Sequence, residues 1–380
     1  MLNLPHGKQG VLPDKYLHQA IDAGIITGGK FAMFHERVQP ASIDLRLGER
    51  AFRIRSSFLP GADTVERKVK TLQMSTLDLR GEGTLLEAGV PYLVELKEHL
   101  RLPRGVRAKA NPKSSTGRVD VFTRVITDGS YLFDEIADGY QGPLYLEVVP
   151  LSFGIRVRED LSLNQLRLSV GRVDLTDAEI RDEHTKESLL FRHGAPVPPD
   201  ELPLMGGLFL SLDLSGVDGL VGYKARDDAP VLDLTLNGPV YPEPYWEPVP
   251  HGEHDRLLLG REKFYLLMSE EAVSIPPGLA AEMTAFDPTS GELRTHYAGF
   301  FDPGFGYSSS DEFRGAQAAL EIRAHDVPFM IEHGQRVCKL TFERMLEEPE
   351  MLYGSGVGSS YQRQSVALGK QFVSPQSQRD

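Results

Sequence analysis

The chain of 380 residues contains a single cysteine, Cys338. One thiol cannot form a disulfide within the chain, and it cannot supply the several cysteine ligands of a structural zinc site. The sequence also lacks an apolar run close to the roughly 18 residues that a membrane span needs, and its first residues show no signal-peptide pattern. These absences predict a protein of the reducing cytoplasm that has no membrane segment.

Positive charge is also scarce, because 41 Lys and Arg residues stand against 54 Asp and Glu residues, a net charge of −13. Such a chain is not expected to offer a broad nucleic-acid surface. Residues 101–124 are the exception, with seven cations, one acid and a net charge of +6. This local charge suits a small anionic ligand, and a solvated basic strand face is the simpler alternative.

The first half of the chain is predicted to be mostly β-structure. Residues 13–25 have the apolar spacing of one short helix that ends at Gly24. Residues 39–48 alternate apolar and polar side chains, as a half-buried strand does. From there to about residue 170, short strands alternate with Gly/Pro turns. This pattern is typical of an all-β barrel or sandwich.

A charged, Pro-rich stretch at 172–204 predicts a short helix and a linker, after which the first half of the sequence returns. The matching segments, at offsets of 169 to 174, are Ser42-Ile43-Asp44-Leu45 with Ser211-Leu212-Asp213-Leu214, Tyr92-Leu93-Val94 with Tyr265-Leu266-Leu267, Asp128 and Glu147 with Asp302 and Glu321, and Gln165-Leu166-Arg167-Leu168 with Lys339-Leu340-Thr341-Phe342. This indicates a duplicated β domain, with a first copy at 1–171, a second copy at 205–346 and a tail at 347–380.

The segment Lys113-Ser114-Ser115-Thr116-Gly117-Arg118 offers hydroxyls, a glycine and two cations on a turn, which suits phosphate oxygens. A polar surface turn is the simpler alternative. The corresponding window of the second copy, 274–297, has a net charge of −2. Electrostatics therefore predicts that the first copy binds the phosphate.

The strand at 142–149 carries one carboxylate, Glu147, in an apolar run. A carboxylate in such a setting is a candidate for proton transfer, although a strand glutamate most often faces solvent. Glu321 occupies the same place in the second copy. The charge difference favours Glu147 over Glu321, while the alternative remains that cations of the first copy serve Glu321.

The last stretch, 353–365, is rich in Gly and Ser with interspersed aromatic and amide side chains. It is either a disordered terminus or a lid that orders over a bound ligand.

Together these features resemble the dCTP deaminases of the dUTPase-like superfamily. The resemblance is carried by the helix at Pro13–Gly24, the strand Gln39–Gly48, the motif Lys113-Ser114-Ser115-x-x-Arg118, the turn Gly139-Tyr140-Gln141-Gly142 followed by Leu144-Tyr145-Leu146-Glu147, and the tail positions Tyr353, Ser360 and Gln364. It implies two tandem dUTPase-like distorted β-barrels of the β-clip or jelly-roll-like kind, with a few short helices. The long, duplicated members of the family are the better match.

The resemblance implies deamination of dCTP to dUTP and ammonia in pyrimidine deoxynucleotide metabolism, on the route to dTTP. Glu147 would be the general acid and base, with Ser114 and Arg118 holding the attacking water and no metal on the protein. The implied substrate-binding residues are Lys113, Ser114, Ser115, Arg118, Asp128, Tyr145, Tyr353 and Gln364. Mg²⁺ would arrive with the triphosphate, zinc would not be needed, and the expected assembly is a homo-oligomer that binds nucleotides but neither nucleic acid nor membrane.

The sequence departs from the family pattern at two places. Lys113 stands where the family has Arg, and the family's base-recognition hairpin is interrupted in the first copy by an insertion at 129–138, whereas the second copy keeps Phe301-Asp302-Pro303-Gly304-Phe305. A dUTP diphosphatase, or an enzyme of both activities, is therefore an alternative in which Asp128 or Asp302 activates water. A non-catalytic nucleotide sensor is a third.

Overall fold

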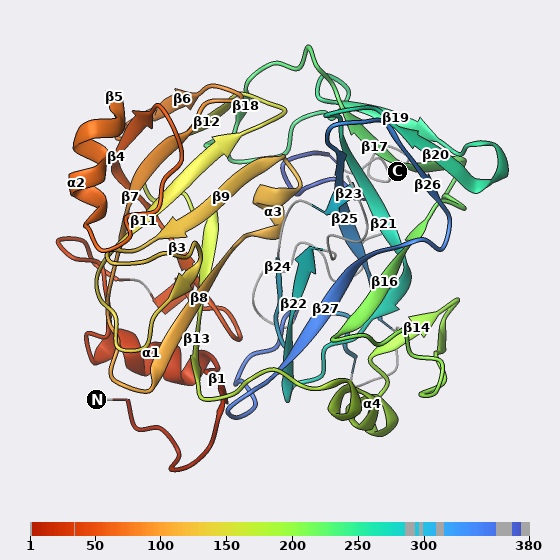
Figure 1. Cartoon of the computed structure of the whole chain (residues 1–380), viewed down its shortest axis with the longest axis horizontal. Coiled ribbons are helices and arrows are strands. Elements are labelled where there is room, and N and C mark those ends of the chain that lie inside the picture. The colour runs from red at the N-terminus through yellow and green to blue at the C-terminus, as the bar shows by residue number, and fades with distance from the viewer. Residues whose placement is uncertain are drawn as a thin grey trace. The chain divides into compact units, whose positions relative to one another are not determined.

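The computed structural model describes residues 2–33, 35–285, 293–295, 299–308, 315–354 and 367–373; for residues 285 and 293–295 it describes the backbone alone. The chain folds as two units (Figure 1). Unit 1 comprises Met1–Val173, Pro230–Gly238 and Met345–Glu350, and unit 2 comprises Asp174–Ala229, Pro239–Arg344 and Met351–Asp380. Unit 1 thus holds the first copy and takes two short segments from the second half of the chain.

Unit 1 is built from short strands with few helical turns. Its helices are α1 (Asp14–Asp22), α2 (Val65–Leu72), the single turn α3 (Ser114–Gly117) and the 3₁₀ turn η1 (His35–Arg37). Its strands are β1 (Gly10–Val11), β2 (Ile26–Thr27), β3 (Ile43–Leu45), β4 (Leu47–Ile54), β5 (Gln73–Asp78), β6 (Thr84–Leu86), β7 (Tyr92–Arg101), β8 (Val106–Pro112), β9 (Val121–Ile126), β10 (Glu135–Ile136), β11 (Gln141–Pro150), β12 (Ile155–Val157), β13 (Asn164–Val170) and β18 (Leu232–Asp233).

Three sheets form the described part of unit 1. In the first, β13 pairs with β1, β3 and β8, and β8 pairs with β10. The second has the order β5-β4-β7-β11-β9, with β2 also on β7. Strand β7 is buried along most of its length, and the charged side chains of Lys97 and Glu98 are buried together with its apolar ones. In the third, β12 pairs with β6 and, in parallel, with β18.

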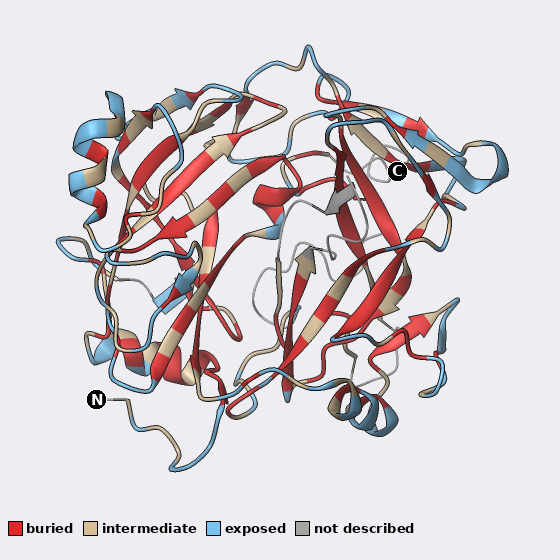
Figure 2. Ribbon diagram, viewed as in Figure 1, coloured by how far each residue is buried: buried red, intermediate tan, exposed pale blue. Residues whose placement is uncertain are grey.

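Helix α2 covers one face of the second sheet (Figure 1). Val65 and Val69 pack against Leu93 of β7 and Ile126 of β9 in one buried cluster, while the outer side of the helix is exposed (Figure 2). Thr64 caps the helix by accepting a hydrogen bond from the Arg67 backbone N–H at 3.3 Å. The sequence pattern did not predict α2, although the Thr cap and the apolar residues four apart were its signal.

The segment Met345–Glu350 completes unit 1 beside α1. Val11 bridges to Met345, and the Leu346 N–H donates to the Val11 carbonyl at 2.8 Å. Lys15 forms an ion pair with Glu347, and the Tyr16 hydroxyl donates to the same carboxylate at 3.1 Å. The Lys15 ammonium lowers the pKa of Glu347 to about 2. Residues from opposite ends of the sequence therefore share one surface of unit 1.

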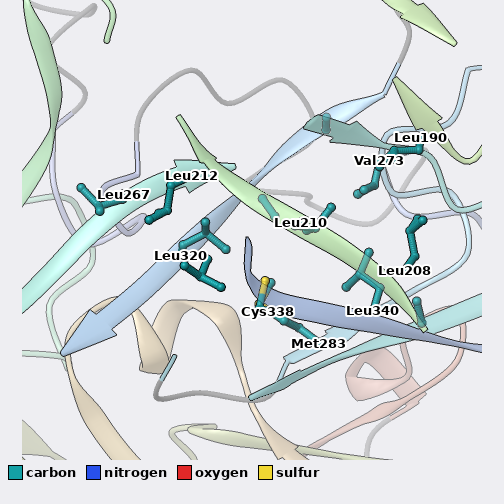
Figure 3. Close-up of a cluster of buried hydrophobic side chains, with 14 of the residues drawn as sticks. Leu190, Leu208, Leu210, Leu212, Leu267, Val273, Met283, Leu320, Cys338 and Leu340 are labelled. Carbon is teal, nitrogen blue, oxygen red and sulfur yellow. The ribbon is translucent and has the colours of Figure 1, made fainter. Parts of the chain in front are cut away.

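Unit 2 contains helix α4 and the remaining strands. Its elements are α4 (Asp177–Lys186), the 3₁₀ turn η2 (Glu253–Asp255), β14 (Leu190–Arg192), β15 (Ala195–Pro196), β16 (Leu208–Asp213), β17 (Leu220–Ala225), β19 (Trp246–Pro250), β20 (Arg256–Leu259), β21 (Phe264–Val273), β22 (Leu279–Ala285), β23 (Leu293–Thr295), β24 (Gly299–Phe301), β25 (Ala316–Ala324), β26 (Phe329–Glu332) and β27 (Arg336–Arg344). Its largest sheet in the described residues runs β15-β14-β21-β16-β27-β22-β24, with β17 and β25 also on β21. Leucines of β16, β21, β25 and β27 meet around the buried Cys338 in its core (Figure 3).

Residues 174–204 of the predicted linker 172–204 are part of unit 2, which corrects the prediction of a linker. A capping box between Thr176 and Glu179 starts α4, and β14 pairs with β21. Five apolar side chains among the charged residues enter the core of unit 2, and this burial holds the segment in place: Ile180, Leu189, Leu190, Val197 and Leu202.

No helix in the described residues is long and apolar enough to cross a bilayer.

Strand registers confirm the duplication. Equivalent pairs recur 173 or 174 residues later in the chain, which is the predicted offset for these strands. The facing pairs are Leu166–Ala110 in β13–β8 with Leu340–Met283 in β27–β22, and Glu147–Leu93 in β11–β7 with Glu321–Leu266 in β25–β21.

The predicted match of Ser42–Leu45 to Ser211–Leu214 is wrong by four residues. Leu45 faces Asn164, and Leu210 faces the equivalent Cys338, so β3 corresponds to β16 with an offset of 165. Buried glutamates support this register: Glu98 accepts from the Arg46 backbone N–H at 2.7 Å and Glu271 from the Ser211 backbone N–H at 2.9 Å. The Ser-apolar-Asp-apolar pattern recurs by coincidence, out of structural register.

Candidate active site

The predicted phosphate motif follows β8 as the single helical turn α3. The Arg118 guanidinium Nε donates to the Ser114 hydroxyl at 3.1 Å, and Arg118 is buried. Lys113 is half-buried and forms an ion pair with Asp44 of β3. Ser114 is exposed, whereas Ser115 is buried. The structure thus joins Lys113, Ser114 and Arg118 in one cluster, with Ser114 open to a ligand.

Two hydrogen bonds to one backbone carbonyl fix the turn α3. The Lys113 N–H donates to the Leu163 carbonyl at 3.1 Å, and the Thr116 hydroxyl donates to the same carbonyl at 2.8 Å. Both bonds tie the turn to the residue before β13. The side chains of Lys113 and Ser114 therefore project from a fixed loop, which is what recognition of a phosphate group requires.

Glu147 lies in the middle of β11, between Leu93 of β7 and Arg124 of β9. Its side chain has no exposed area. Oε1 accepts hydrogen bonds from Arg124 Nη2 at 2.6 Å and Nε at 3.2 Å. Oε2 has no hydrogen-bond partner among the described residues. The prediction of a buried strand carboxylate is confirmed by its position, while its catalytic role stays a prediction.

Arg124 is the residue of this site that sequence reasoning missed. It was counted among the cations of 101–124, but its position opposite Glu147 follows from the β9–β11 register. Its guanidinium also donates to the Ser57 hydroxyl at 2.8 Å. The guanidinium carbon lies 3.7 Å from the Phe133 ring centre and 4.6 Å from that of Phe122. Cation–π contacts of this kind add to the ion pair.

Asp128 and Tyr145 lie at the helix α2 side of the same sheet. The Asp128 carboxylate accepts from the Val65 backbone N–H at 2.7 Å, so it holds the first turn of α2. Tyr145 packs against the cluster beneath α2, and burial, followed by the Asp128 charge, raises its pKa to about 12. Their predicted substrate contacts stay predictions, and the structure gives Asp128 a helix-capping role.

The predicted equivalence of Asp128 and Asp302 is wrong. The Tyr140 N–H donates to the Ala137 carbonyl, and the Phe305 N–H donates to the Asp302 carbonyl, both at 3.1 Å. Ala137 therefore corresponds to Asp302. The equal spacing of each Asp from its Glu misled the alignment, because extra residues precede this turn in the first copy and follow it in the second.

In unit 2, Glu321 occupies the register position of Glu147, and Asp302 is also buried. The Tyr353 N–H donates to the Pro303 carbonyl at 2.8 Å, and its ring lies 5.8 Å from the Phe305 ring. The predicted tail residues Ser360 and Gln364 lie outside the described residues. So does most of the segment that corresponds to the phosphate motif, with residues 293–295 described by their backbone alone.

Comparison with known families agrees with this geometry. The sequence model of the 2'-deoxycytidine 5'-triphosphate deaminase N-terminal domain matches residues 8–172, and that of the C-terminal domain matches residues 176–372. The chain belongs to the dCTP deaminase family.

A solved relative of this family has the same architecture. The crystal structure of 2'-deoxycytidine 5'-triphosphate deaminase from Agrobacterium tumefaciens is similar with a TM-score of 0.82 and 42% identity, over 89% of this chain and 99% of that one. A dCTP deaminase of Natronomonas pharaonis is 30% identical over 165 residues, which are 41% of this chain and 81% of the relative. A protein of Methanothermobacter thermautotrophicus named "dCTP deaminase, dUMP-forming" is 26% identical over 138 residues, 36% of this chain and 67% of the relative.

Proposed function

We infer that this enzyme is a dCTP deaminase of the long, internally duplicated form. The observation that carries this conclusion is the match of both family domains, end to end, over residues 8–172 and 176–372. The strand glutamate that recurs at one register position in both copies supports it. The reaction consumes dCTP and water and gives dUTP and ammonia, which places the enzyme in pyrimidine deoxynucleotide metabolism.

The proposed mechanism is hydrolytic and uses no metal held by the protein. The Ser114 hydroxyl and Arg118 hold a water that attacks C4 of the cytosine. A strand glutamate takes one proton of this water and delivers it to N3, where it stays in the product. The glutamate then takes the proton of the new C4 hydroxyl and delivers it to the amino group, so that the C4–N bond breaks, ammonia leaves and the C4 carbonyl forms. General acid–base catalysis of this kind contributes about 10²–10⁴-fold, and fixed orientation of the water contributes much of the rest.

The triphosphate would be bound by Lys113, the hydroxyls of Ser114 and Ser115, and Arg118. Their cluster supports this role, because charge-assisted hydrogen bonds to phosphate oxygens are strong and directional. Mg²⁺ is part of the substrate complex in this proposal. Zinc deaminases need a ligand set with two or three cysteines, and this chain has only Cys338. We also propose that the enzyme is a hydrolase and works as a homo-oligomer.

A second candidate is a bifunctional enzyme that also cleaves dUTP to dUMP. It is favoured by the relative from Methanothermobacter thermautotrophicus, whose name states that it forms dUMP. One assay separates the candidates: the full chain is incubated with dCTP and Mg²⁺, and ammonia and pyrophosphate are measured separately. Ammonia alone supports deamination, and both products together support the bifunctional enzyme. Binding of dCTP without either product would contradict both and leave a nucleotide sensor.

A further inference from the structure

The cations of residues 101–124 do not all belong to the candidate active site. Arg104 and Arg107 stand at the opposite end of β8 from Lys113, Arg104 just before the strand and Arg107 within it. At about 3.3 Å per strand residue, Arg107 lies roughly 20 Å from Lys113. In the part of the chain that the structure describes, neither Arg104 nor Arg107 has a carboxylate partner. The phosphate motif therefore does not account for these two arginines.

An open pocket of about 490 Å³ lies beside Arg107 in unit 1. Its walls come from the first residues of the chain, the turn before β8 and the end of β13. Leu4, Pro5 and Val170 give the pocket an apolar side, and Lys8 and Arg107 give it a basic side. Sites for small molecules have volumes of about 300–1,000 Å³. The pocket thus has room for an anion that carries an organic group.

Arg107 is oriented for an anion in this pocket. The residue is half-buried, and its Nη1 donates to the Gly171 carbonyl at 2.7 Å. A guanidinium has five N–H donors in a fixed plane, so this bond orients the group and leaves donors for a ligand. Phosphate oxygens accept such donors in pairs, and these bonds are about twice as strong as bonds between neutral groups. Arg107 is therefore suited to a phosphate group.

The charged neighbours of Arg107 do not cancel its charge. Asp138 accepts from one backbone N–H with both carboxylate oxygens, each at 2.9 Å, so a backbone group already occupies this carboxylate. Lys8 forms an ion pair with Glu347 at 3.3 Å. Two guanidinium groups, those of Arg104 and Arg107, then stand against the one carboxylate of Asp138. The pocket keeps a positive charge that attracts an anion.

We propose that this pocket is a second anion site, which binds a small phosphate monoester separately from the nucleotide of the candidate active site. Arg107 contacts the phosphate group, and the apolar side formed by Leu4, Pro5 and Val170 contacts the organic group. The proposal does not depend on deamination, because binding at this pocket is measured without turnover.

The test uses phenyl phosphate, which joins a phosphate monoester to an apolar ring and lacks the sugar and base of a nucleotide. Calorimetric titration of the full chain gives the affinity, and thermal unfolding reports the fold. Lys113→Gln weakens the phosphate motif of the candidate active site, so it should leave phenyl phosphate binding at the pocket intact. Adding Arg107→Gln should weaken that binding at least about tenfold, because hydrogen bonds between charged groups are lost. Arg80→Gln is the control, since Arg80 is exposed and pairs with Asp78 at 2.7 Å.

Three results would overturn the proposal: phenyl phosphate affinity that Arg107→Gln leaves unchanged, binding that Lys113→Gln alone abolishes, and no binding to the wild type at millimolar concentrations. Arg107→Gln by itself should keep the dCTP turnover of the wild type. Loss of that turnover in the folded variant would place Arg107 in the substrate site and contradict a separate pocket.

If Arg107→Gln does not fold, Leu4→Glu takes its place, because it puts a carboxylate on the pocket wall in a segment outside the helices and strands. It should also weaken phenyl phosphate at least about tenfold, and unchanged affinity would refute the site. Inorganic phosphate separates the two sources of the anion. We expect it to bind at least about tenfold more weakly than phenyl phosphate, because it leaves the apolar side uncovered. Equal affinities would overturn the assignment to an organic phosphate.

Discussion

Removal of the Arg124 side chain should reveal how much the buried ion pair contributes to unit 1. In Arg124→Leu the Glu147 carboxylate stays buried with neither oxygen bonded to Arg124. Breaking a buried pair in this way costs about 3–5 kcal/mol. Arg124 is 26% exposed, so water can partly replace it and the lower end applies. The lost contact with Phe133 adds about 0.5–1 kcal/mol. We expect a total of about 3.5–4 kcal/mol, which corresponds to about 7–16 °C in melting temperature for a domain of this size.

Hydrogen exchange of peptides from β9 and β11 measures this loss within unit 1, whereas the fluorescence of Trp246, the only tryptophan, reports on unit 2. The double variant Arg124→Leu/Glu147→Leu should recover much of the stability, because replacing both partners removes the unpaired charge. Arg50→Leu is the control, since its cross-strand pair with Glu95 at 2.8 Å is exposed and worth less than about 1 kcal/mol. A loss below 1 kcal/mol in Arg124→Leu, or a double variant no more stable than the single one, would refute the reasoning.

Three further predictions concern the metal, the tail and helix α4. Activity abolished by chelation should return with Mg²⁺ alone, and a requirement for added zinc would contradict the metal-free mechanism. Gln364→Ala should raise the KM for dCTP if the tail closes over substrate, whereas Phe372→Ala, which removes the ring packed 5.9 Å from Trp246, should cost about 3–5 kcal/mol of stability instead. His184 is buried with its Nε2 2.7 Å from the Val197 carbonyl, and burial lowers its pKa below the usual 6.5. Its neutral form therefore contributes stability that is present above pH 6.5 and lost as the pH falls further, so wild-type melting temperature should drop more between pH 7 and pH 5 than that of His184→Gln, and parallel curves would contradict this.

The duplication was predictable because strand patterns survive divergence, as Leu166 and Leu340 illustrate by facing equivalent partners. The exact alignment of the two copies was not predictable where a short pattern occurs twice. For this reason Leu45 was aligned with Leu214, although the structure aligns it with Leu210. Register depends on which backbone groups bond across the sheet, and a four-residue error leaves the alternation of apolar side chains unchanged.

Some residues of the candidate site could be predicted from the sequence, and others could not. Lys113, Ser114 and Arg118 are close in sequence, so their clustering could be predicted from the turn that they form. The partner of Glu147 could not, because Arg124 lies on the other side of the insertion at 129–138 and meets the glutamate only through the β9–β11 register. Asp128 was matched with Asp302 only because each precedes its glutamate by the same number of residues. That spacing was misleading, because the extra residues precede the turn in the first copy and follow it in the second.

Unit 1 is built from three segments that are far apart in the sequence, and this affects how the protein folds during synthesis. Its last segment ends at residue 350, which is 177 residues after the first part ends at residue 173. At about 5–20 residues per second, the ribosome needs roughly 10–35 s to deliver those residues. For the first 60 of these residues β12 lacks its partner β18, and for nearly the whole interval Val11 lacks its bridge to Met345. Unpaired strand edges template association with other chains, so the nascent protein is most vulnerable to aggregation after its first half has emerged and before its second half can close it.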